Sequence, residues 1–258
     1  MTWLEGKLLG FDLEATGTDP LTARPVSFAL AYFDSGACTR VRHGLIHPGI
    51  PIPADSTKVH HITDEMVDER GGDLERSVVG IAGELYLASS EGTPVVGMNL
   101  RYDLSVIDQR LRAIEEEPTT LREIGWKGPV IDALVLDRQY DKYRKGHRTL
   151  GDLCAHYGVP TGQSHAAGDD AVAAVNVCLA IARKHAEVRD GDLSTLTWLQ
   201  RQWQHDWLMG YNEYRVKQGK KPVPESEGDW PLFGDRFEPY HVDLEEQRRL
   251  REGVEAPF

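Results

Sequence analysis

The chain has 258 residues, of which 40% are hydrophobic, and a formal net charge of −12. This hydrophobic fraction allows a sizeable core, whereas the acidic balance excludes a protein that holds nucleic acid on a broad basic surface. No apolar run approaches the roughly 18 residues of a membrane span, and no secretory signal precedes the first strand. We therefore expect a cytoplasmic protein with no membrane contact.

The three cysteines are Cys38, Cys154 and Cys178, and no two of them form a C-x-x-C pair. An odd count with wide spacing indicates reduced thiols, not a disulfide framework or a zinc site. Because all three lie in apolar stretches of sequence, we expect them to be buried.

The first part of the chain predicts an antiparallel meander. Strands are expected over residues 7–12, 25–33 and 39–46, because these runs are rich in β-forming side chains and are separated by turn residues. The Pro-rich residues 47–53 predict a loop. Thr63 is a predicted N-cap for the short helix that follows it, and a longer helix is expected over residues 74–88.

Strands and helices alternate in the second part of the chain. The apolar periodicity predicts a strand at 93–98, a helix at 102–114, a strand at 130–132 with a helix to about 140, and helices at 149–157 and 169–185. Gly158 is a predicted C-cap. The order of elements predicts an α/β fold with a mixed sheet flanked by helices.

The composition changes near residues 189–192. A helix is predicted from residue 195 to about 217, with Trp203 and Trp207 close to one face, and residues 219–258 are rich in Pro, Gly and charge. We expect residues 1–188 to form one domain. Residues 189–258 would be a C-terminal extension, made of a Trp-rich helix and an irregular tail, with the helix packed on the domain or on a partner.

Acidic side chains recur where predicted strands end. Asp12 and Glu14 follow an apolar run at spacing i, i+2, so that they point to the same face of a strand. A second apolar run leads to Asn99 and Asp103, and the segment His165–Asp170 opens a long apolar helix.

Carboxylates that are brought together without cations repel one another, so this pattern predicts a divalent-metal site. Asp12, Glu14, Asp103 and Asp170 are the candidate ligands. Two ions about 3.5–4 Å apart would activate a water and stabilise the leaving oxygen of a phosphodiester. His165 is the candidate general base, because an imidazole titrates near neutral pH.

Each motif also has an ordinary structural interpretation. A D-x-E pair at a strand end is commonly solvated, Asn99 and Asp103 can cap a helix, and acids at the start of a helix suit its dipole. His165 alone would be an ordinary loop histidine. The functional interpretation depends on all the motifs occurring together, in this order.

Together the motifs resemble those of the DEDDh 3′–5′ exonucleases, or DnaQ-like family, which includes the polymerase III epsilon proofreading subunit, RNase T and oligoribonuclease. The family's D-x-E followed by T-G matches residues 12–17, its N-x-x-x-D matches Asn99–Asp103, and its H-x-x-x-x-D matches His165–Asp170. Residues 59–63 resemble the family's V-H-G-I-T segment, with His61 in place of the glycine. The resemblance covers about residues 6–183.

The resemblance implies an RNase H-like fold and two Mg²⁺ or Mn²⁺ ions. It implies release of nucleoside 5′-monophosphates from single-stranded 3′ ends, with DNA favoured and RNA also an option. Asp12, Glu14, Asp103 and Asp170 become the metal ligands, and the spacing from His165 selects Asp170 over Asp169. The residues expected at the terminal nucleotide are Leu13, Ala15, Thr16, His60 and Asn99.

Other interpretations stay open at this point. The C-terminal helix could make the chain a partner-dependent module on a replication, repair or RNA-processing protein, and a homodimer would follow several relatives. A different RNase H-like nuclease that cuts internally is disfavoured by the spacing of His165 and Asp170. Neither a Gln-rich linker nor a short β-clamp-binding peptide is recognised, so the resemblance does not by itself predict proofreading in a replicase.

Overall fold

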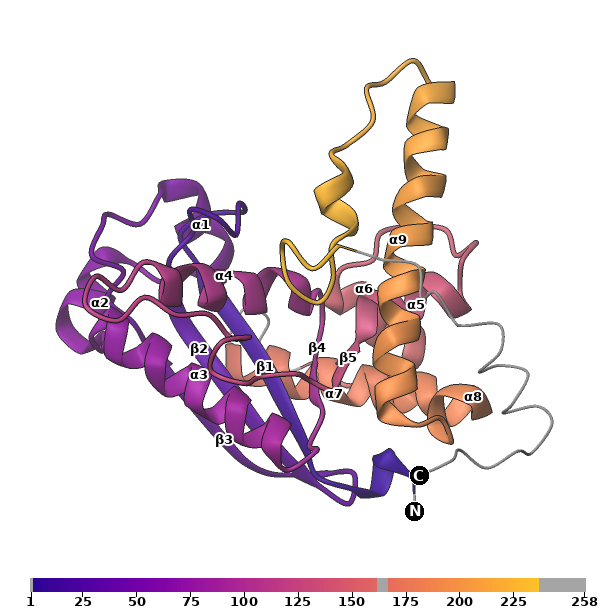
Figure 1. Ribbon diagram of the computed structural model, residues 1–258, viewed down its shortest axis with the longest axis horizontal. Coiled ribbons are helices and arrows are strands. Elements are labelled where there is room, and N and C mark those ends of the chain that lie inside the picture. The colour runs from indigo at the N-terminus through magenta and orange to yellow at the C-terminus, as the bar shows by residue number, and fades with distance from the viewer. Residues whose placement is uncertain (1, 162–166, 237–258) are drawn as a thin grey trace, which may run out of the picture.

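The computed structural model of the chain describes residues 2–161 and 167–236. Within these residues a five-stranded mixed sheet has the strand order β3-β2-β1-β4-β5 (Figure 1). The first three strands form an antiparallel meander, and β4 and β5 run parallel to β1. The strands are β1 (Leu8–Ala15), β2 (Pro25–Asp34), β3 (Ala37–Leu45), β4 (Val95–Gly97) and β5 (Val130–Asp132).

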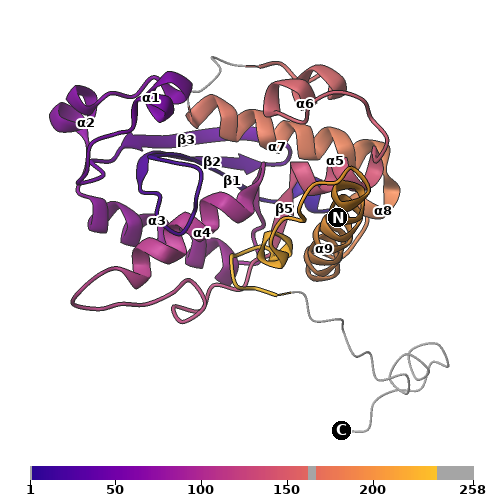
Figure 2. The same cartoon turned by 90° about the horizontal axis from the view of Figure 1, so that it is seen from above.

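Helices cover both faces of the sheet (Figure 2). One face carries α3 (Leu74–Ser90) and α4 (Leu100–Arg112), and the other carries α7 (Ala167–Lys184) with α5 (Ala133–Tyr140) and α6 (Leu150–Tyr157). The other helices are α1 (Ala54–His60), α2 (Asp64–Arg70), α8 (Ala186–Arg189), α9 (Leu193–Lys217) and the 3₁₀ turns Trp3–Glu5 and Glu225–Gly228. The predicted α/β fold with a mixed sheet flanked by helices is confirmed.

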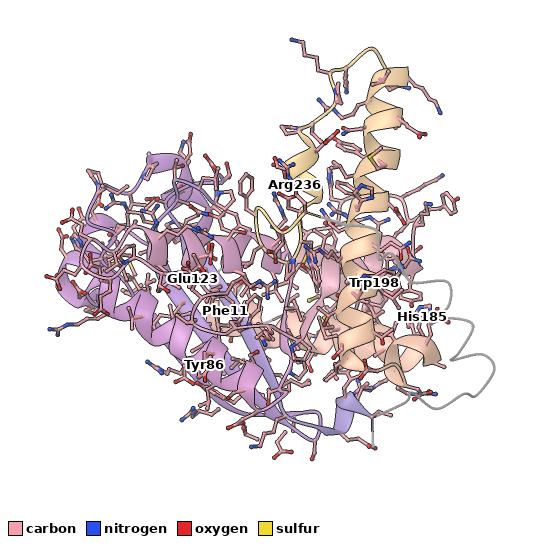
Figure 3. All side chains as sticks on the ribbon, in the orientation of Figure 1. Phe11, Tyr86, Glu123, His185, Trp198 and Arg236 are labelled. Atoms are coloured by element: carbon pink, nitrogen blue, oxygen red, sulfur yellow. The ribbon has the colours of Figure 1, made fainter. Side chains whose placement is uncertain are left out.

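The alternation of side chains along β1 decides which residues face α7. Leu9, Phe11 and Leu13 are buried in the core on the side of α3 and α4 (Figure 3 labels Phe11), so the residues between them face α7. A Cβ atom at Gly10 would lie 2.8 Å from Val175 Cγ2, which shows how closely α7 packs on the centre of β1. This close approach brings the start of α7 to the carboxyl end of β1.

Two expectations about local structure need correction. Cys38 is exposed on β3, because β3 is an edge strand that no helix covers at that point, whereas Cys154 and Cys178 are buried as expected. The short polar helix α1, which begins directly after Pro53, was not expected from the sequence. A helix of seven residues with one buried side chain has too little apolar periodicity to be recognised.

The C-terminal helix α9 packs on β5 and α5. The Trp203 ring makes an edge-to-face contact with Tyr140 at 5.6 Å, and Trp207 stacks on Tyr211 at 5.2 Å. The aromatic side of the helix therefore has intramolecular partners. The hydrophobic core contains residues from both sides of position 188. The division into 1–188 and 189–258 stays a prediction. In the described part of the chain, no helix is both long and apolar enough to cross a membrane.

Candidate active site

Three carboxylates converge at the carboxyl end of β1. Asp12 and Glu14 are half-buried and face α7, and opposite them on β2 lie the small residues Ala29 and Ser27. The first turn of α7 carries Asp170. One carboxylate oxygen from each of Asp12, Glu14 and Asp170 lies within 4.8 Å of the others. We call these three residues the acidic cluster.

Asp103 approaches the acidic cluster from the first turn of α4. Its side chain is 4% exposed, and its Oδ1 atom accepts a hydrogen bond from the backbone N–H of Leu13 at 3.1 Å. Asp103 is not one of the three tightly grouped carboxylates, but it is close enough to raise the pKa of Asp12. The structure thus brings the four predicted metal ligands into one region.

The start of α4 is held by a residue to which the sequence analysis gave no role. Asn99 has a left-handed backbone, with φ 60° and ψ 37°, and its side chain does not cap the helix. Instead the buried carboxylate of Asp132, at the end of β5, accepts hydrogen bonds from the N–H groups of Asn99 and Leu100, both at 2.9 Å. The signal in the sequence was an acid directly after a buried apolar strand.

Burial and mutual repulsion perturb the site carboxylates. Burial raises the pKa of Asp12 well above its usual range, and Asp103, Glu14 and Asp170 raise it further. Burial, followed by the charge of Asp170, raises the pKa of Glu14 from 4.5 to about 7. Burial also raises the pKa of Asp103, against the opposing effect of the Leu13 N–H.

These shifts have a chemical consequence. Without added positive charge, the carboxylates repel one another and retain protons. A divalent cation would supply the positive charge that these carboxylates lack. Carboxylate oxygens are hard ligands, and they bind hard cations such as Mg²⁺ or Mn²⁺ in preference to softer metals. The donor set therefore fits the predicted metal site.

Tyr102 connects α4 to the loop after β1. Its hydroxyl donates a hydrogen bond to the backbone carbonyl of Gly17. Burial raises the pKa of this tyrosine, and the charges of Asp103 and Glu14 raise it further. The contact fixes the chain directly after the D-x-E motif, a role that the sequence did not reveal.

The residues expected at a terminal nucleotide have different surroundings. The side chains of Leu13 and Ala15 are buried in the core, so that only their backbone groups can face a ligand. Thr16 is also buried, and its Oγ1 atom accepts a hydrogen bond from the N–H of Arg24 at 3.0 Å. Asn99 is exposed beside the site. Their roles in binding substrate stay predictions.

His60 is buried at the end of α1, and its Nδ1 atom accepts a hydrogen bond from the N–H of Ile62 at 3.1 Å. It lines a cleft of about 490 Å³ that also includes His43 and Asp169. His61, the next residue, has a left-handed backbone with φ 60°. This geometry favours glycine and explains why the resembling family carries one there.

The third motif lies only partly within the described residues. His165 falls in 162–166, outside them, so its predicted role as general base stays a prediction. Asp169 is exposed and Asp170 belongs to the acidic cluster. This placement agrees with the choice of Asp170 over Asp169 from the spacing.

Comparison with known proteins decides the family. The exonuclease family model RNase_T matches residues 9–178, about two thirds of the chain. The chain belongs to this exonuclease family. The match covers β1 through most of α7, including every residue predicted to bind metal, and it confirms the resemblance to the DnaQ-like exonucleases.

Two relatives illustrate the range of proteins that contain such a domain. The PolC-type DNA polymerase III of Pediococcus pentosaceus is 30% identical over 187 residues, which are 72% of this chain but 12% of that protein. The DNA polymerase III subunit epsilon of Treponema pallidum is 24% identical over 178 residues, covering 69% of this chain and 77% of that protein. The chain thus spans about an eighth of the PolC-type relative.

Solved structures of exonuclease I share the fold. The E. coli enzyme in complex with a dA16 oligonucleotide has a TM-score of 0.59 and 17% identity, covering 71% of this chain and 42% of that one. Exonuclease I from Methylocaldum szegediense has a TM-score of 0.57 and 22% identity. The predicted RNase H-like arrangement is confirmed by this similarity.

Proposed function

We propose that this protein is a metal-dependent 3′–5′ exonuclease that removes nucleoside 5′-monophosphates from single-stranded 3′ ends, with DNA favoured over RNA. The observation that carries the proposal is the acidic cluster. Three carboxylates within 4.8 Å of one another, with Asp103 beside them, form a site that positive charge would stabilise. The family match supports nuclease chemistry at this site.

Each acidic residue has a defined place in the proposed mechanism. Asp12, Glu14 and Asp170 would hold the metal from β1 and α7, and Asp103 would hold it from α4. When bound, divalent ions supply positive charge that lowers the pKa of a water and stabilises the departing oxygen. His165 would accept the proton of the attacking water. Because Asp103 also accepts from Leu13 N–H, its orientation is fixed before substrate arrives.

Two observations favour a single strand over a duplex. The net charge of −12 leaves little attraction for the long charged backbone of a duplex outside the metal site. The cleft lined by His60 also adjoins the acidic cluster, because its lining includes Ser27, which pairs with Glu14, and Asp169, and a cleft of this size suits the end of a single strand. A related exonuclease I has been solved with an oligonucleotide, which supports a substrate of this kind.

The test is a gel assay of 5′-labelled single-stranded DNA and RNA with Mg²⁺ or Mn²⁺. The expected result is a ladder of 3′-shortened products that Asp12→Asn abolishes. Asp206→Asn, which changes an exposed residue on α9, is the matched control and should retain the ladder. The relative rates on the two substrates give the sugar preference.

A circular single strand separates this proposal from an internally cutting nuclease. The proposed enzyme leaves the circle intact, because it needs a 3′ end. Cleavage of the circle, or the absence of any ladder with either metal, would contradict the proposal.

A further inference from the structure

Asp132 connects the ends of two helices. Its carboxylate accepts hydrogen bonds from Asn99 and Leu100 at the start of α4, and from the N–H of Leu134 at the start of α5 at 2.9 Å. The side chain is 1% exposed. A carboxylate at a helix N-terminus satisfies N–H groups that have no partner within the helix and interacts favourably with the helix dipole. One buried acid therefore fixes both helices to the end of β5.

This cap determines where Asp103 lies. Asn99 adopts a left-handed backbone that is unfavourable for a residue with a Cβ atom, and its N–H is bonded to Asp132. The helix turns directly from this residue into the segment that carries Asp103. A shift of the cap would move Asp103 relative to Asp12 on β1.

The C-terminal part of the chain contacts Asp132 from two sides. The backbone N–H of Asp132 donates to Oε1 of Gln200 at 2.7 Å, and the same amide donates from Nε2 to the carbonyl of Val130 at 2.8 Å. Gln200 is fully buried on α9. The indole N–H of Trp230 points to Oδ2 of Asp132 at 3.5 Å, and this tryptophan is 1% exposed.

The residues that follow α9, here called the C-terminal segment, also contact α4 on both sides of Asp103. The N–H of Phe233 donates to Oγ of the buried Ser105 at 2.7 Å. Arg101 donates to the carbonyl of Ser226 at 2.6 Å. Figure 1 shows this yellow segment returning from the tip of α9 to the end of β4, where α4 begins.

The far end of the segment is also attached. The carbonyl of Arg236, labelled in Figure 3, accepts a hydrogen bond from Arg201 of α9 at 2.6 Å. Asp235 pairs with Arg122. The segment is therefore held at several points along its length.

From these contacts we infer that Gln200, Ser226, Trp230 and Phe233, here called the C-terminal clamp, position the metal ligand Asp103 through Asp132 and the first turn of α4. All four residues lie outside the matched family region 9–178. Residues 189–236 would then contribute to the function of the active site by positioning one of its metal ligands. The inference rests on the proposed function, because it takes Asp103 as a metal ligand.

The test compares two tryptophan substitutions in the full-length protein. Trp230→Phe removes the indole N–H that reaches Asp132 and keeps an aromatic ring. Trp126→Phe is the matched control, because Trp126 is equally buried in the same core and its indole N–H has no hydrogen-bond partner among the residues that the structure describes. Both variants should lower the melting temperature in EDTA to a similar extent.

The deciding readout is Mn²⁺ affinity, measured by calorimetry without nucleic acid. Trp230→Phe should raise the Kd about three- to tenfold, since groups that support metal ligands affect affinity by about 10–100-fold when they contact the ligand directly. Ser105→Ala, which removes the acceptor for Phe233 N–H, should shift the Kd in the same direction. Trp126→Phe should leave the Kd unchanged.

Activity gives a second, independent readout. In Trp230→Phe, kcat at saturating Mn²⁺ should approach that of the wild type, while the Mn²⁺ concentration at half-maximal rate rises. Equal Kd values for Trp230→Phe and Trp126→Phe would overturn the clamp and leave the proposed function intact. A wild type that binds no Mn²⁺ would overturn the proposed function, and the clamp with it.

Discussion

The half-buried acidic cluster and the fully buried Asp137 both lie within the α/β fold, but their surroundings differ. Asp137 is fully buried and accepts hydrogen bonds from Arg144 at 3.1 Å, from Arg148 and from the hydroxyl of Tyr157 at 2.9 Å. Within residues 2–161 and 167–236, no arginine or lysine forms an ion pair with Asp12, Glu14 or Asp103.

This difference distinguishes a structural acid from a reactive one. A buried charge is tolerated when cations of the chain surround it, and then it fixes the fold. Asp12, Glu14 and Asp103 have no such arginine or lysine among the described residues, so their mutual repulsion destabilises the fold and they gain from ions that come from solution. Activity, stability and pH dependence should all differ between the two kinds of acid.

The largest effect is expected from removing one charge of the acidic cluster. Asp170→Asn should lower the rate of nucleotide release about 1000-fold, because metal-based stabilisation is worth several kcal/mol. Asp169→Asn changes the exposed neighbour and should alter the rate less than about threefold. Single-turnover assays at saturating Mn²⁺ check both. An equal loss of rate in the two variants would contradict the choice of Asp170 over Asp169 as the metal ligand.

Removing a carboxylate charge should have opposite effects on stability at Asp137 and at Asp12. Asp137→Asn should lower the free energy of unfolding by about 3 kcal/mol, because it leaves Arg144 and Arg148 without their buried counter-charge. Asp12→Asn should leave the metal-free protein as stable as the wild type or make it more stable, because it relieves repulsion. Urea unfolding in EDTA measures both. A destabilised Asp12→Asn protein would show that the cluster is already compensated.

The pH dependence of stability should also reveal the raised pKa of Glu14. Between pH 4.5 and about 7, folded Glu14 retains a proton that the unfolded chain has released. Raising the pH through this window therefore destabilises the metal-free protein. The melting temperature in EDTA should fall as the pH rises to 8, fall less in Glu14→Gln, and recover with Mn²⁺. A melting temperature that rises over this window would contradict the raised pKa.

The smallest effect concerns the approach of α7 to β1, which sets the distance between Asp170 and Asp12. Gly10→Ala should destabilise the protein by about 1–3 kcal/mol, since its Cβ would press on Val175 and Ala171. Gly80→Ala, at an exposed position of α3 with open space around it, should stabilise by up to about 1 kcal/mol. Thermal unfolding of both variants checks the prediction. Equal stability would show that α7 can shift.

The sequence was enough to predict the sheet and the positions of the acids, because both depend on local patterns. Alternation along residues 8–15 assigns Asp12 and Glu14 to one face, and Thr63 and Gly158 end up as the caps that their residue types favour. The order of the motifs along the chain also gave Asp103 and Asp170 as candidate ligands across long sequence separations, and their role in binding metal stays a prediction.

Contacts between distant segments could not be predicted in this way. Asp132 caps α4 from 32 residues away, and Trp230 reaches Asp132 across 98 residues. Neither contact leaves a periodic pattern, since each depends on where separate elements meet in the folded chain. The edge position of Cys38 likewise follows from strand order, which a single strand's sequence does not reveal.

The raised pKa values of Asp12, Glu14 and Asp103 link metal loading to proton release. At neutral pH Glu14, whose pKa is raised to about 7, is partly protonated, and an arriving divalent ion would displace that proton, so the measured heat of loading should depend on the ionisation enthalpy of the buffer. Acidification should therefore compete with metal loading, because protons and the metal ion bind the same carboxylates.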